Sequence, residues 1–472
     1  MRLRARTTAE SPVSAPRVAI IGAGVAGLAA AWTLTREAPD VEIVVLERAP
    51  RAGGLIATER TPKGFLVEHG ADCLVTTKPW GVELVRAAGL GGALVTGAEP
   101  RRSFIAVDGK LVPLPPLFAA RAFEVARGLA QTPLLTLPGK VRLCAELFIG
   151  HRHLGSDESV GTFVTRRFGR ELLEAIVAPL MSGIYGGHAD LLSAEACLPR
   201  LRALERQHGS IAIGMRRMLR ARHQRAAREQ ILPPMVSLRH GMESLTGTLA
   251  HALGHRLSLG VAVEGMRRLA GGRFRIATSA GDIDSDGVIL AVPAWAAPAL
   301  VAELDPDIAD ALATLPHKAL DCVTLAWRAR DIPGSLAGTG FVTAPTGTRS
   351  TIACTWASHK WPGRAPEDSV LVRSVLSKPD ASEADLLTLA RSDLRDILGV
   401  TASPTLTRVR RVPRATPIYR VGHLGRVAWM RERAHAIGAF ALAGNAHGGI
   451  GIPDCIQSGQ VAARSVHQSL LG

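Results

Sequence analysis

The chain has 472 residues, of which 47% are hydrophobic and 21% are charged. This composition excludes a disordered or collagen-like chain and is enough for about three domains. Lys and Arg number 56 against 41 Asp and Glu, a formal net charge of +15 that favours an acidic substrate or an anionic lipid surface as partner. Nucleic acid is not expected, because aromatic residues make up 4% and leave few platforms for stacked bases.

The cysteines and the N-terminal segment indicate the compartment. Six Cys are scattered through the chain without a CxxC pair, so neither a metal site nor a disulfide framework is expected. Residues 1–16 are polar and lack the apolar core of a secretory signal, and no run of 18 apolar residues predicts a membrane-spanning helix. We therefore expect a cytoplasmic protein with reduced thiols.

The first third of the chain alternates buried strands with helices. Residues 17–21 and 41–46 are apolar runs typical of buried parallel strands, and residues 28–37 between them have a helical pattern. They make a strand–helix–strand unit of about 30 residues. A further strand is predicted at 65–68 and a helix at 79–88.

The pattern changes at residue 111. Residues 111–150 combine Pro with Leu, Phe and Arg, and helices are predicted to continue to about residue 229. This stretch fits either an ordinary helical subdomain or an amphipathic basic surface lying on the inner face of a membrane. Strands return from residue 231, include a buried one at 288–292, alternate with helices over 300–410, and end at 440–444 before a Gly-rich turn and a last helix.

The strongest motif is the G-x-G-x-x-G sequence between the first strand and the first helix. In this context Gly22 permits the tight turn, Gly24 lets a pyrophosphate approach the backbone, and Gly27 lets the helix pack close to the sheet. Glu47 ends the second strand, where a carboxylate accepts hydrogen bonds from ribose hydroxyls. The predicted dinucleotide contacts are Gly22, Ala23, Gly24, Val25, Ala26, Gly27 and Glu47.

Two further Gly-rich segments indicate which dinucleotide binds. Residues 47–54 read E-R-x-x-R-x-G-G, which resembles the extended signature of FAD-containing amine-oxidase-type flavoproteins. Residues 443–456 predict a strand, a Gly-rich turn and a helix start, whose backbone N–H groups can face a negatively charged group. We therefore expect non-covalent FAD as the cofactor, with His447 and Cys455 interpreted as packing residues of that turn.

These motifs divide the chain into three predicted parts. We expect an α/β fold with a discontinuous Rossmann-like FAD-binding domain, a mixed-sheet substrate domain and an inserted helical subdomain. The FAD-binding domain is assigned to residues 17–85, 231–298 and 412–472. The mainly helical insertion, the candidate for membrane contact, is assigned to 86–230, and the substrate-binding domain to 299–411.

Four stretches outside the fingerprint resemble the oxygen-dependent porphyrinogen oxidases of haem biosynthesis, which act on protoporphyrinogen IX or coproporphyrinogen III. They are residues 179–187 (PLMSGIYGG) with 192–193, residues 205–210 (ERQHGS), residues 354–362 (CTWASHKWP), and residues 417–423 (PIYRVGH) leading to 451–456 (GIPDCI). Together with the fingerprint they span nearly the whole chain. The resemblance implies six-electron oxidation of a tetrapyrrole substrate to the porphyrin, with FAD as cofactor and dioxygen as electron acceptor.

The resemblance also implies roles for individual residues. Gly183 matches a glycine whose carbonyl faces the substrate ring, and Thr339 and Val342 match positions that sandwich the tetrapyrrole, often Phe and Leu in the family. The arginine that pairs with a propionate in some members aligns with Ser103, so the preceding Arg101 and Arg102 are the candidates for that role. The matched FAD contacts are Gly22 to Gly27, Glu47, Arg48, Leu55, Gly70, Ala71, Asp72, Val263, Ile450, Gly451 and Ile452.

Other functions of the same fold stay open as alternatives. An amine oxidase usually has an aromatic cage beside the flavin, and Tyr185 and Tyr419 are the only tyrosines. A carotenoid-type desaturase fits the apolar character but not the Trp-Pro and Pro-Asp-Cys stretches, and a non-enzymatic prenyl-binding relative would lack the fingerprint. The substrate is open between the two porphyrinogens, with residues 360–362 and 451–454 favouring coproporphyrinogen III, and the oligomeric state is open, a homodimer being one option.

Overall fold

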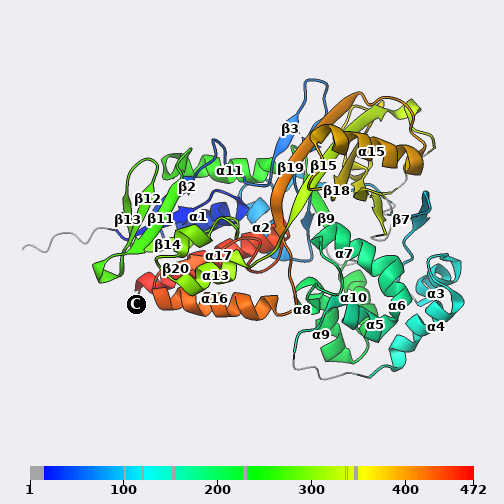
Figure 1. Cartoon of the computed structure of the whole chain (residues 1–472), viewed down its shortest axis with the longest axis horizontal. Helices are drawn as coiled ribbons and strands as arrows, with labels where there is room; N and C mark the ends of the chain where they lie inside the picture. Colours follow the sequence, from blue (N-terminus) through cyan, green and yellow to red (C-terminus); the bar gives the residue numbers. More distant parts are fainter. Residues whose placement is uncertain are drawn as a thin grey trace, which may run out of the picture.

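The computed structural model describes residues 15–99, 102–117, 122–150, 156–226, 231–334, 336, 338–344 and 349–471. They form a layered α/β part, a seven-stranded sheet with one long helix, and a cluster of helices (Figure 1). The chain passes between these parts repeatedly, so each is assembled from segments far apart in sequence. Within the described residues, no helix has both the length and the apolar character needed to cross a bilayer.

A five-stranded sheet in the order β10-β2-β1-β14-β20 is the centre of the α/β part, and all of its pairs are parallel. Val, Ile, Leu and Ala dominate the central strands, because both faces of the sheet are covered. The strands are β1 (Arg17–Ile21), β2 (Glu42–Glu47), β10 (Leu257–Leu259), β14 (Gly287–Leu290) and β20 (Phe440–Leu442).

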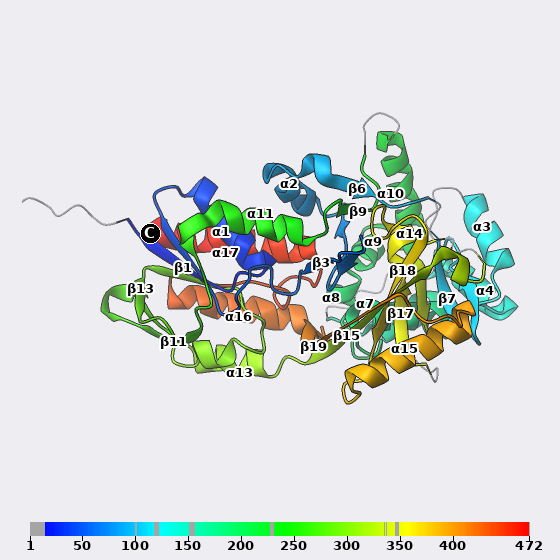
Figure 2. The same ribbon diagram turned by 90° about the horizontal axis from the view of Figure 1, so that it is seen from above.

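Two hydrophobic cores cover this sheet. One face packs against α1 (Val25–Glu37), α2 (Pro79–Ala87), α11 (Glu243–Leu253) and α17 (Ile452–Leu471). The other face packs against α12 (Pro298–Val301), α13 (Pro306–Ala313), α16 (His423–Ile437) and the antiparallel sheet of β11 (Val263–Arg268), β12 (Phe274–Thr278) and β13 (Ile283–Ser285). Figure 2 shows the helices α11 and α17 on the side opposite α13.

The seven-stranded sheet has the order β19-β15-β18-β17-β16-β7-β8. All of its pairs are antiparallel except β16 with β7. Its elements are β7 (Ser103–Val107), β8 (Lys110–Pro113), β15 (His317–Arg328), β16 (Gly340–Thr343), β17 (Thr351–Thr355), β18 (Ser369–Leu376) and β19 (Leu406–Pro417), with α14 (Ala357–Lys360) and α15 (Glu383–Leu398). Strands β7 and β8 come from the stretch assigned to the helical insertion, and the last residues of β19 come from a stretch assigned to the FAD-binding domain. This sheet therefore draws on all three predicted domains, whose limits stay a prediction.

The helical cluster has its own core, centred on Phe163, Phe168 and Ile176. Residues 111–113 belong to β8, and the first helix of the cluster begins at Ala122. The cluster contains α3 (Ala122–Gln131), α4 (Leu137–Cys144), a 3-10 turn (Ala145–Phe148), α5 (Val160–Phe168), α6 (Arg170–Leu172), a π-helical turn (Leu173–Val177), α7 (Ala178–Tyr185), α8 (Ala194–Cys197), α9 (Pro199–His208) and α10 (Ile211–Ala226).

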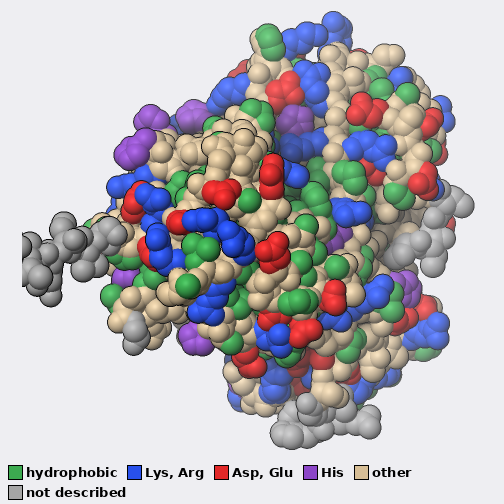
Figure 3. Space-filling view, turned by 60° about the vertical axis from the view of Figure 1, so that its left-hand side comes forward, with side chains coloured by type: hydrophobic (Ala, Val, Ile, Leu, Met, Phe, Trp, Pro, Cys, Tyr) green, Lys and Arg blue, Asp and Glu red, His purple; other side chains and the backbone are tan. Residues whose placement is uncertain are grey.

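Short strands connect the two larger sheets. The hairpin of β3 (Thr58–Arg60) and β4 (Leu66–Glu68), and the sheet of β5 (Leu74–Val75), β9 (Met235–Leu238) and β6 (Leu94–Thr96), flank the segment that carries Gly70 to Asp72. On the face drawn in Figure 3, Lys and Arg side chains are interspersed with Asp and Glu.

Candidate flavin and substrate site

The turn after β1 has the geometry that a pyrophosphate requires. Gly22 has φ +101°, and a Cβ atom on Gly27 would lie 1.9 Å from the Gly22 carbonyl oxygen, so both positions need glycine. A Cβ atom on Gly24 would meet nothing within 4 Å, which leaves open space beside the backbone. Gly24 is also the N-cap of α1, without a side-chain cap or an acidic residue in the first turn. The N–H groups of that turn are therefore available to an anion, and these residues fit the diphosphate of FAD.

Glu47 and its surroundings lie at the end of β2. The Glu47 carboxylate accepts hydrogen bonds from the backbone N–H groups of Ala23 (2.8 Å) and Ala49 (2.9 Å). The Glu47 carbonyl oxygen accepts the N–H of Val261 (2.9 Å), two residues before Val263. The exposed Arg48 guanidinium lies 5.6 Å from the ring centre of Trp295. Three of the predicted FAD contacts, Glu47, Arg48 and Val263, thus gather at one edge of the parallel sheet.

A continuous path leads from this turn towards the seven-stranded sheet. The N–H of Gly53 donates to the Ala23 carbonyl at 2.8 Å, and a Cβ atom on Gly54 would lie 3.3 Å from the Cα of Gly24. A Cβ atom on Gly70 would lie 2.3 Å from the Leu55 carbonyl oxygen. The predicted contacts Leu55 and Gly70 are therefore neighbours, although 15 residues separate them in the sequence.

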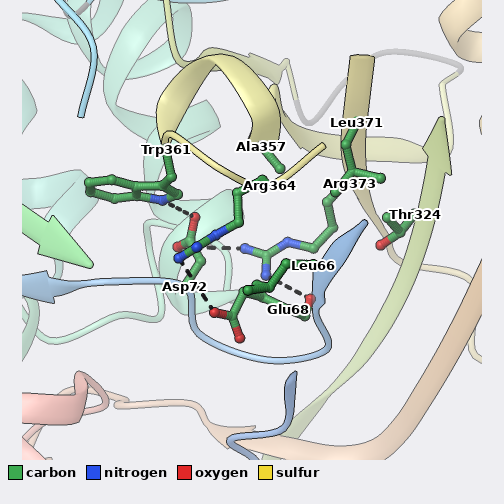
Figure 4. Close-up of a pocket in the computed structure, with 9 residues that line it drawn as sticks. All are labelled: Leu66, Glu68, Asp72, Thr324, Ala357, Trp361, Arg364, Leu371 and Arg373. Carbon is green, nitrogen blue, oxygen red and sulfur yellow. Dashed lines mark hydrogen bonds and ion pairs between the residues drawn. The ribbon is translucent and has the colours of Figure 1, made fainter. Parts of the chain in front are cut away.

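Asp72 lies in a buried cluster of charges beside the seven-stranded sheet, whose strand β18 contributes Arg373 (Figure 4). Its carboxylate accepts hydrogen bonds from Lys360 Nζ (2.9 Å) and Trp361 Nε1 (3.0 Å) and lies 3.7 Å from the Arg373 guanidinium. Burial by itself would raise the pKa of Asp72, but the charges of Lys360 and Arg373 and these hydrogen bonds hold it well below its ordinary value. Asp72 is therefore ionised and fixed in place.

The same cluster fixes the backbone that leads to Asp72. Arg373 donates to the carbonyl oxygens of Gly70 and Glu68. The Glu68 carboxyl group accepts the N–H of Met242 at 2.8 Å and lies 3.7 Å from Arg364, and burial raises its pKa. Sequence reasoning missed Arg364 and Arg373, and it noted Lys360 only as part of a family stretch, because these side chains meet Asp72 only in the folded chain.

The Gly-rich turn before α17 is held by a second ion pair that the sequence did not predict. Lys78 Nζ lies 2.5 Å from one carboxylate oxygen of Asp454 and 2.7 Å from the other. Asp454 also accepts the N–H of Gly451 at 3.3 Å. A Cβ atom on Gly449, whose φ is +146°, would lie 2.5 Å from the Asp454 side chain. The predicted contacts at 450–452 thus belong to a turn with a defined shape.

His447 in this turn and Cys455 in the first turn of α17 are both buried. Burial lowers the pKa of His447 to about 3 and raises the pKa of Cys455 to about 12. An imidazole with so low a pKa is a weak base, and a protonated thiol is a poor nucleophile. The structure is consistent with their interpretation as packing residues. Across the part of the chain that the structure describes, no group of three His, Cys, Asp or Glu side chains could hold a metal ion.

Two of the residues predicted to hold the substrate, Gly183 and Val342, lie where α7 meets the seven-stranded sheet. A Cβ atom on Gly183 would lie 3.4 Å from Cγ1 of Val342 and 3.7 Å from Cβ of Ala353. Thr339 donates its backbone N–H to the Arg102 carbonyl oxygen at 2.7 Å. The structure thus pairs Gly183 with Val342 and Thr339 with Arg102.

Of the two arginines before β7, the structure describes Arg102 but not Arg101. Arg102 is exposed, and its neighbour Ser103 shares a hydrogen bond of 2.9 Å with the Thr339 hydroxyl. Arg101, the other candidate for the propionate, lies outside the described residues. Their roles towards a substrate stay predictions.

Fold and cofactor turn together define the class of this protein. A family model described as flavin containing amine oxidoreductase matches residues 25–467, and the chain belongs to this family. The predicted fold class, the FAD cofactor and the assignment to the oxidoreductases are thereby confirmed.

Individual relatives indicate which oxidoreductases of this family the chain resembles. Coproporphyrinogen III oxidase of Bacillus subtilis (strain 168) is 30% identical over 463 residues, which cover 94% of this chain and 96% of the relative. Chloroplastic protoporphyrinogen oxidase 1 of Arabidopsis thaliana is 28% identical and covers 95% of this chain and 87% of its own length. The crystal structure of a candidate protoporphyrinogen oxidase from Exiguobacterium sp. 255-15 superposes with a TM-score of 0.82 at 31% identity, covering 97% of this chain and 100% of that one.

Proposed function

We propose that this protein oxidises a porphyrinogen to the porphyrin in haem biosynthesis, and that coproporphyrinogen III is its preferred substrate. The reaction removes six electrons and six protons from the macrocycle, and three molecules of dioxygen take them up as three of hydrogen peroxide. FAD, when bound, supplies the acceptor for each hydride. The chain's own residues hold the macrocycle, orient it and keep water out.

The contact of Gly183 with Val342 and Ala353 carries this proposal. A glycine backbone next to two aliphatic side chains offers an apolar surface that a flat ring can approach closely. Arg102, beside Thr339, is placed to bind a propionate at the ring edge, because a guanidinium matches a carboxylate with two parallel hydrogen bonds. These residues bind and orient the substrate and do not transfer protons.

The tyrosines argue against an amine oxidase. The rings of Tyr185 and Tyr419 lie 6.5 Å apart and are tilted by 44°, so they do not form two parallel walls. The Tyr185 hydroxyl donates to the Cys197 carbonyl (3.0 Å), and the Tyr419 hydroxyl donates to the Asn445 carbonyl. Tyr419 also stacks on His423 with ring centres 3.9 Å apart. Both phenols therefore have structural partners.

Two observations favour coproporphyrinogen III over protoporphyrinogen IX. Lys360 and Asp454 belong to the two stretches whose sequence resembles the coproporphyrinogen type, and both form ion pairs of the cofactor region. The relatives named coproporphyrinogen III oxidase from Bacillus subtilis and Propionibacterium freudenreichii are 30% and 31% identical, against 28% for the Arabidopsis protoporphyrinogen oxidase.

A side-by-side assay tests the proposal. Purified FAD-loaded protein is mixed in air with freshly reduced coproporphyrinogen III or protoporphyrinogen IX, and porphyrin fluorescence and peroxide are followed. We expect both substrates to be oxidised, the first with the higher kcat/KM, and about three peroxides per porphyrin. Rates no higher than those of FAD alone with both substrates would refute the proposal.

We also propose that the helical cluster lies on an anionic membrane surface. Side chains of α3, α4 and the following 3-10 turn expose large apolar area: Phe123 is 72% exposed, Leu137 75% and Phe148 88%. Lys140 and Arg142 lie on the same segment. Apolar side chains flanked by cations are typical of interfacial helices, and a poorly soluble product would be released near lipid.

Flotation with vesicles of phosphatidylglycerol and phosphatidylcholine tests this surface. The double variant Phe123→Ser and Phe148→Ser should lose salt-sensitive flotation, whereas Leu471→Ser, which changes an equally exposed leucine at the end of α17, should float like the wild type. Equal flotation of all three proteins would contradict the assignment. The prediction that the chain forms a homodimer is tested by light scattering of the same preparation.

A further inference from the structure

Lys318 on β15 reaches the last turn of α7, on the element that carries Gly183. Its Nζ donates a hydrogen bond to the Ser182 carbonyl oxygen at 3.1 Å. Its stem occupies the space beside Gly186, where a Cβ atom would lie 1.8 Å from the Lys318 Cδ. Gly186 has φ +74° and ends the helix. The Lys318 stem fits because residue 186 has no side chain, and its ammonium group lies at the carbonyl group that precedes Gly183.

Lys318 differs from two other partly buried lysines, Lys360 and Lys78, in having no carboxylate partner within the part of the chain that the structure describes. Lys360 has Asp72 and Lys78 has Asp454, each within 2.9 Å. Burial lowers the pKa of Lys318 to about 8, so near neutral pH most of it still carries a proton. Taking an ammonium group out of water without a counter-ion is costly, and such groups concentrate at binding sites.

The helix end by itself does not balance this charge. The C-terminus of a helix has only about half an elementary charge spread over its last carbonyl groups. The N–H of Gly186 already donates to the Ser182 carbonyl oxygen at 3.1 Å. An ammonium group has three donors, of which this carbonyl takes one. The remaining donors suit an anionic ligand that arrives with the substrate.

We propose that Lys318 binds a propionate of the tetrapyrrole and thereby selects a tetracarboxylate over a dicarboxylate substrate. This inference rests on the proposed function. Coproporphyrinogen III has a propionate on each of its four rings, whereas protoporphyrinogen IX has two propionates and two vinyl groups. Arg102 lies beside Thr339 at the start of β16, and Lys318 lies against the end of α7. Two cations on separate elements can bind propionates on different rings. A vinyl group, which has no charge, would not be bound by Lys318.

Kinetics of Lys318→Met, Lys318→Arg and the control Lys378→Met test the assignment. Methionine keeps the stem over Gly186 and removes the charge, and Lys378 is exposed after β18. We expect Lys318→Met to raise KM for coproporphyrinogen III by about 10- to 150-fold, with kcat and the KM for protoporphyrinogen IX changed less than about threefold. Lys318→Arg should restore most of the affinity, and Lys378→Met should behave like the wild type.

The pH dependence separates binding from a structural role. In the wild type, KM for coproporphyrinogen III should rise above the pKa of about 8, because Lys318 loses its proton there, and this rise should be absent in Lys318→Met. An equal rise of KM for both substrates, or an unchanged ratio of the two, would overturn the assignment and leave a helix-capping lysine.

Binding of coproporphyrin III to the FAD-loaded protein, followed by quenching of tryptophan fluorescence, keeps the two proposals apart. If the wild type oxidises neither porphyrinogen but Lys318→Met binds coproporphyrin III at least tenfold more weakly, the proposed function fails and the role of Lys318 stands. If both proteins bind this tetracarboxylate equally, the role of Lys318 fails, whatever the activity.

Discussion

The substitution Gly183→Ala should move stability and activity in opposite directions. Gly183 lies inside α7, and the added methyl group would lie 3.4 Å from Val342 and 3.7 Å from Ala353, which are ordinary contact distances. The folded protein therefore has room for it. Alanine inside a helix is more favourable than glycine by about 0.5–1 kcal/mol, because the unfolded chain loses less conformational freedom.

The same methyl group would lie between Gly183 and Val342, two residues that we expect to contact the substrate ring. A ring that must approach the Gly183 backbone would be displaced by about 1 Å or more, and a displacement of that size can reduce the rate on the order of 10²-fold. We expect kcat/KM for coproporphyrinogen III to fall by about that factor while the FAD content stays normal. Porphyrin fluorescence gives the rate, and urea unfolding gives the free energy of unfolding.

Gly247→Ala is the matched control. Gly247 lies in α11 on an exposed face, and a Cβ atom there would meet nothing within 4 Å. It should gain a similar free energy of unfolding and keep wild-type kinetics. A Gly183→Ala protein whose kcat/KM stays within about threefold of the wild type would refute the placement of the substrate beside Gly183.

Three more substitutions test other parts of the site. Gly24→Val should give folded protein without FAD, because the side chain would occupy the open space beside the backbone where the diphosphate fits; flavin absorbance per protein measures this, and full FAD content would contradict it. Arg102→Ala should raise KM for coproporphyrinogen III about 10- to 150-fold at constant kcat, the loss of roughly 1.5–3 kcal/mol for a charge-assisted hydrogen bond; an unchanged KM would contradict propionate binding by Arg102. Asp72→Asn should lower the free energy of unfolding by about 3 kcal/mol near pH 7, since it leaves two buried cations unpaired. The pKa of Asp72 is depressed in the folded protein, so its stabilising effect is full above the ordinary value of 3.8 and is lost as the pH falls below it; urea unfolding that shows the same wild-type advantage at pH 3 and pH 7 would contradict this.

Sequence reasoning reached the dinucleotide unit because its requirements are local. The first strand was predicted at 17–21 and is observed at Arg17–Ile21, and the second is shifted by one residue, to Glu42–Glu47. The turn between them needs glycine at Gly22 and Gly27 for steric reasons that involve nearby backbone. A short pattern of glycines between a buried strand and a helix therefore contains nearly all the information that the fold uses there.

The sheet of the substrate domain could not be predicted from local sequence patterns. Strands β7 and β8 lie in a stretch interpreted as helical, and β7 joins the sheet through a parallel pairing with β16, more than 200 residues later in the chain. A strand of four or five residues has too little periodicity to reveal its partner. The pairing depends on long-range packing, which no local pattern encodes.

The amino-acid sequence by itself determined the cofactor turn, the family and the kind of substrate, because glycines and family stretches act through backbone geometry close to each motif. Only the tertiary structure decided which charges face one another. Asp72 meets Lys360 across 288 residues, and Lys318 meets Ser182 across 136. Whether a partly buried lysine has a carboxylate partner depends on where distant segments pack, and its pKa and its capacity to bind an anion follow from that packing.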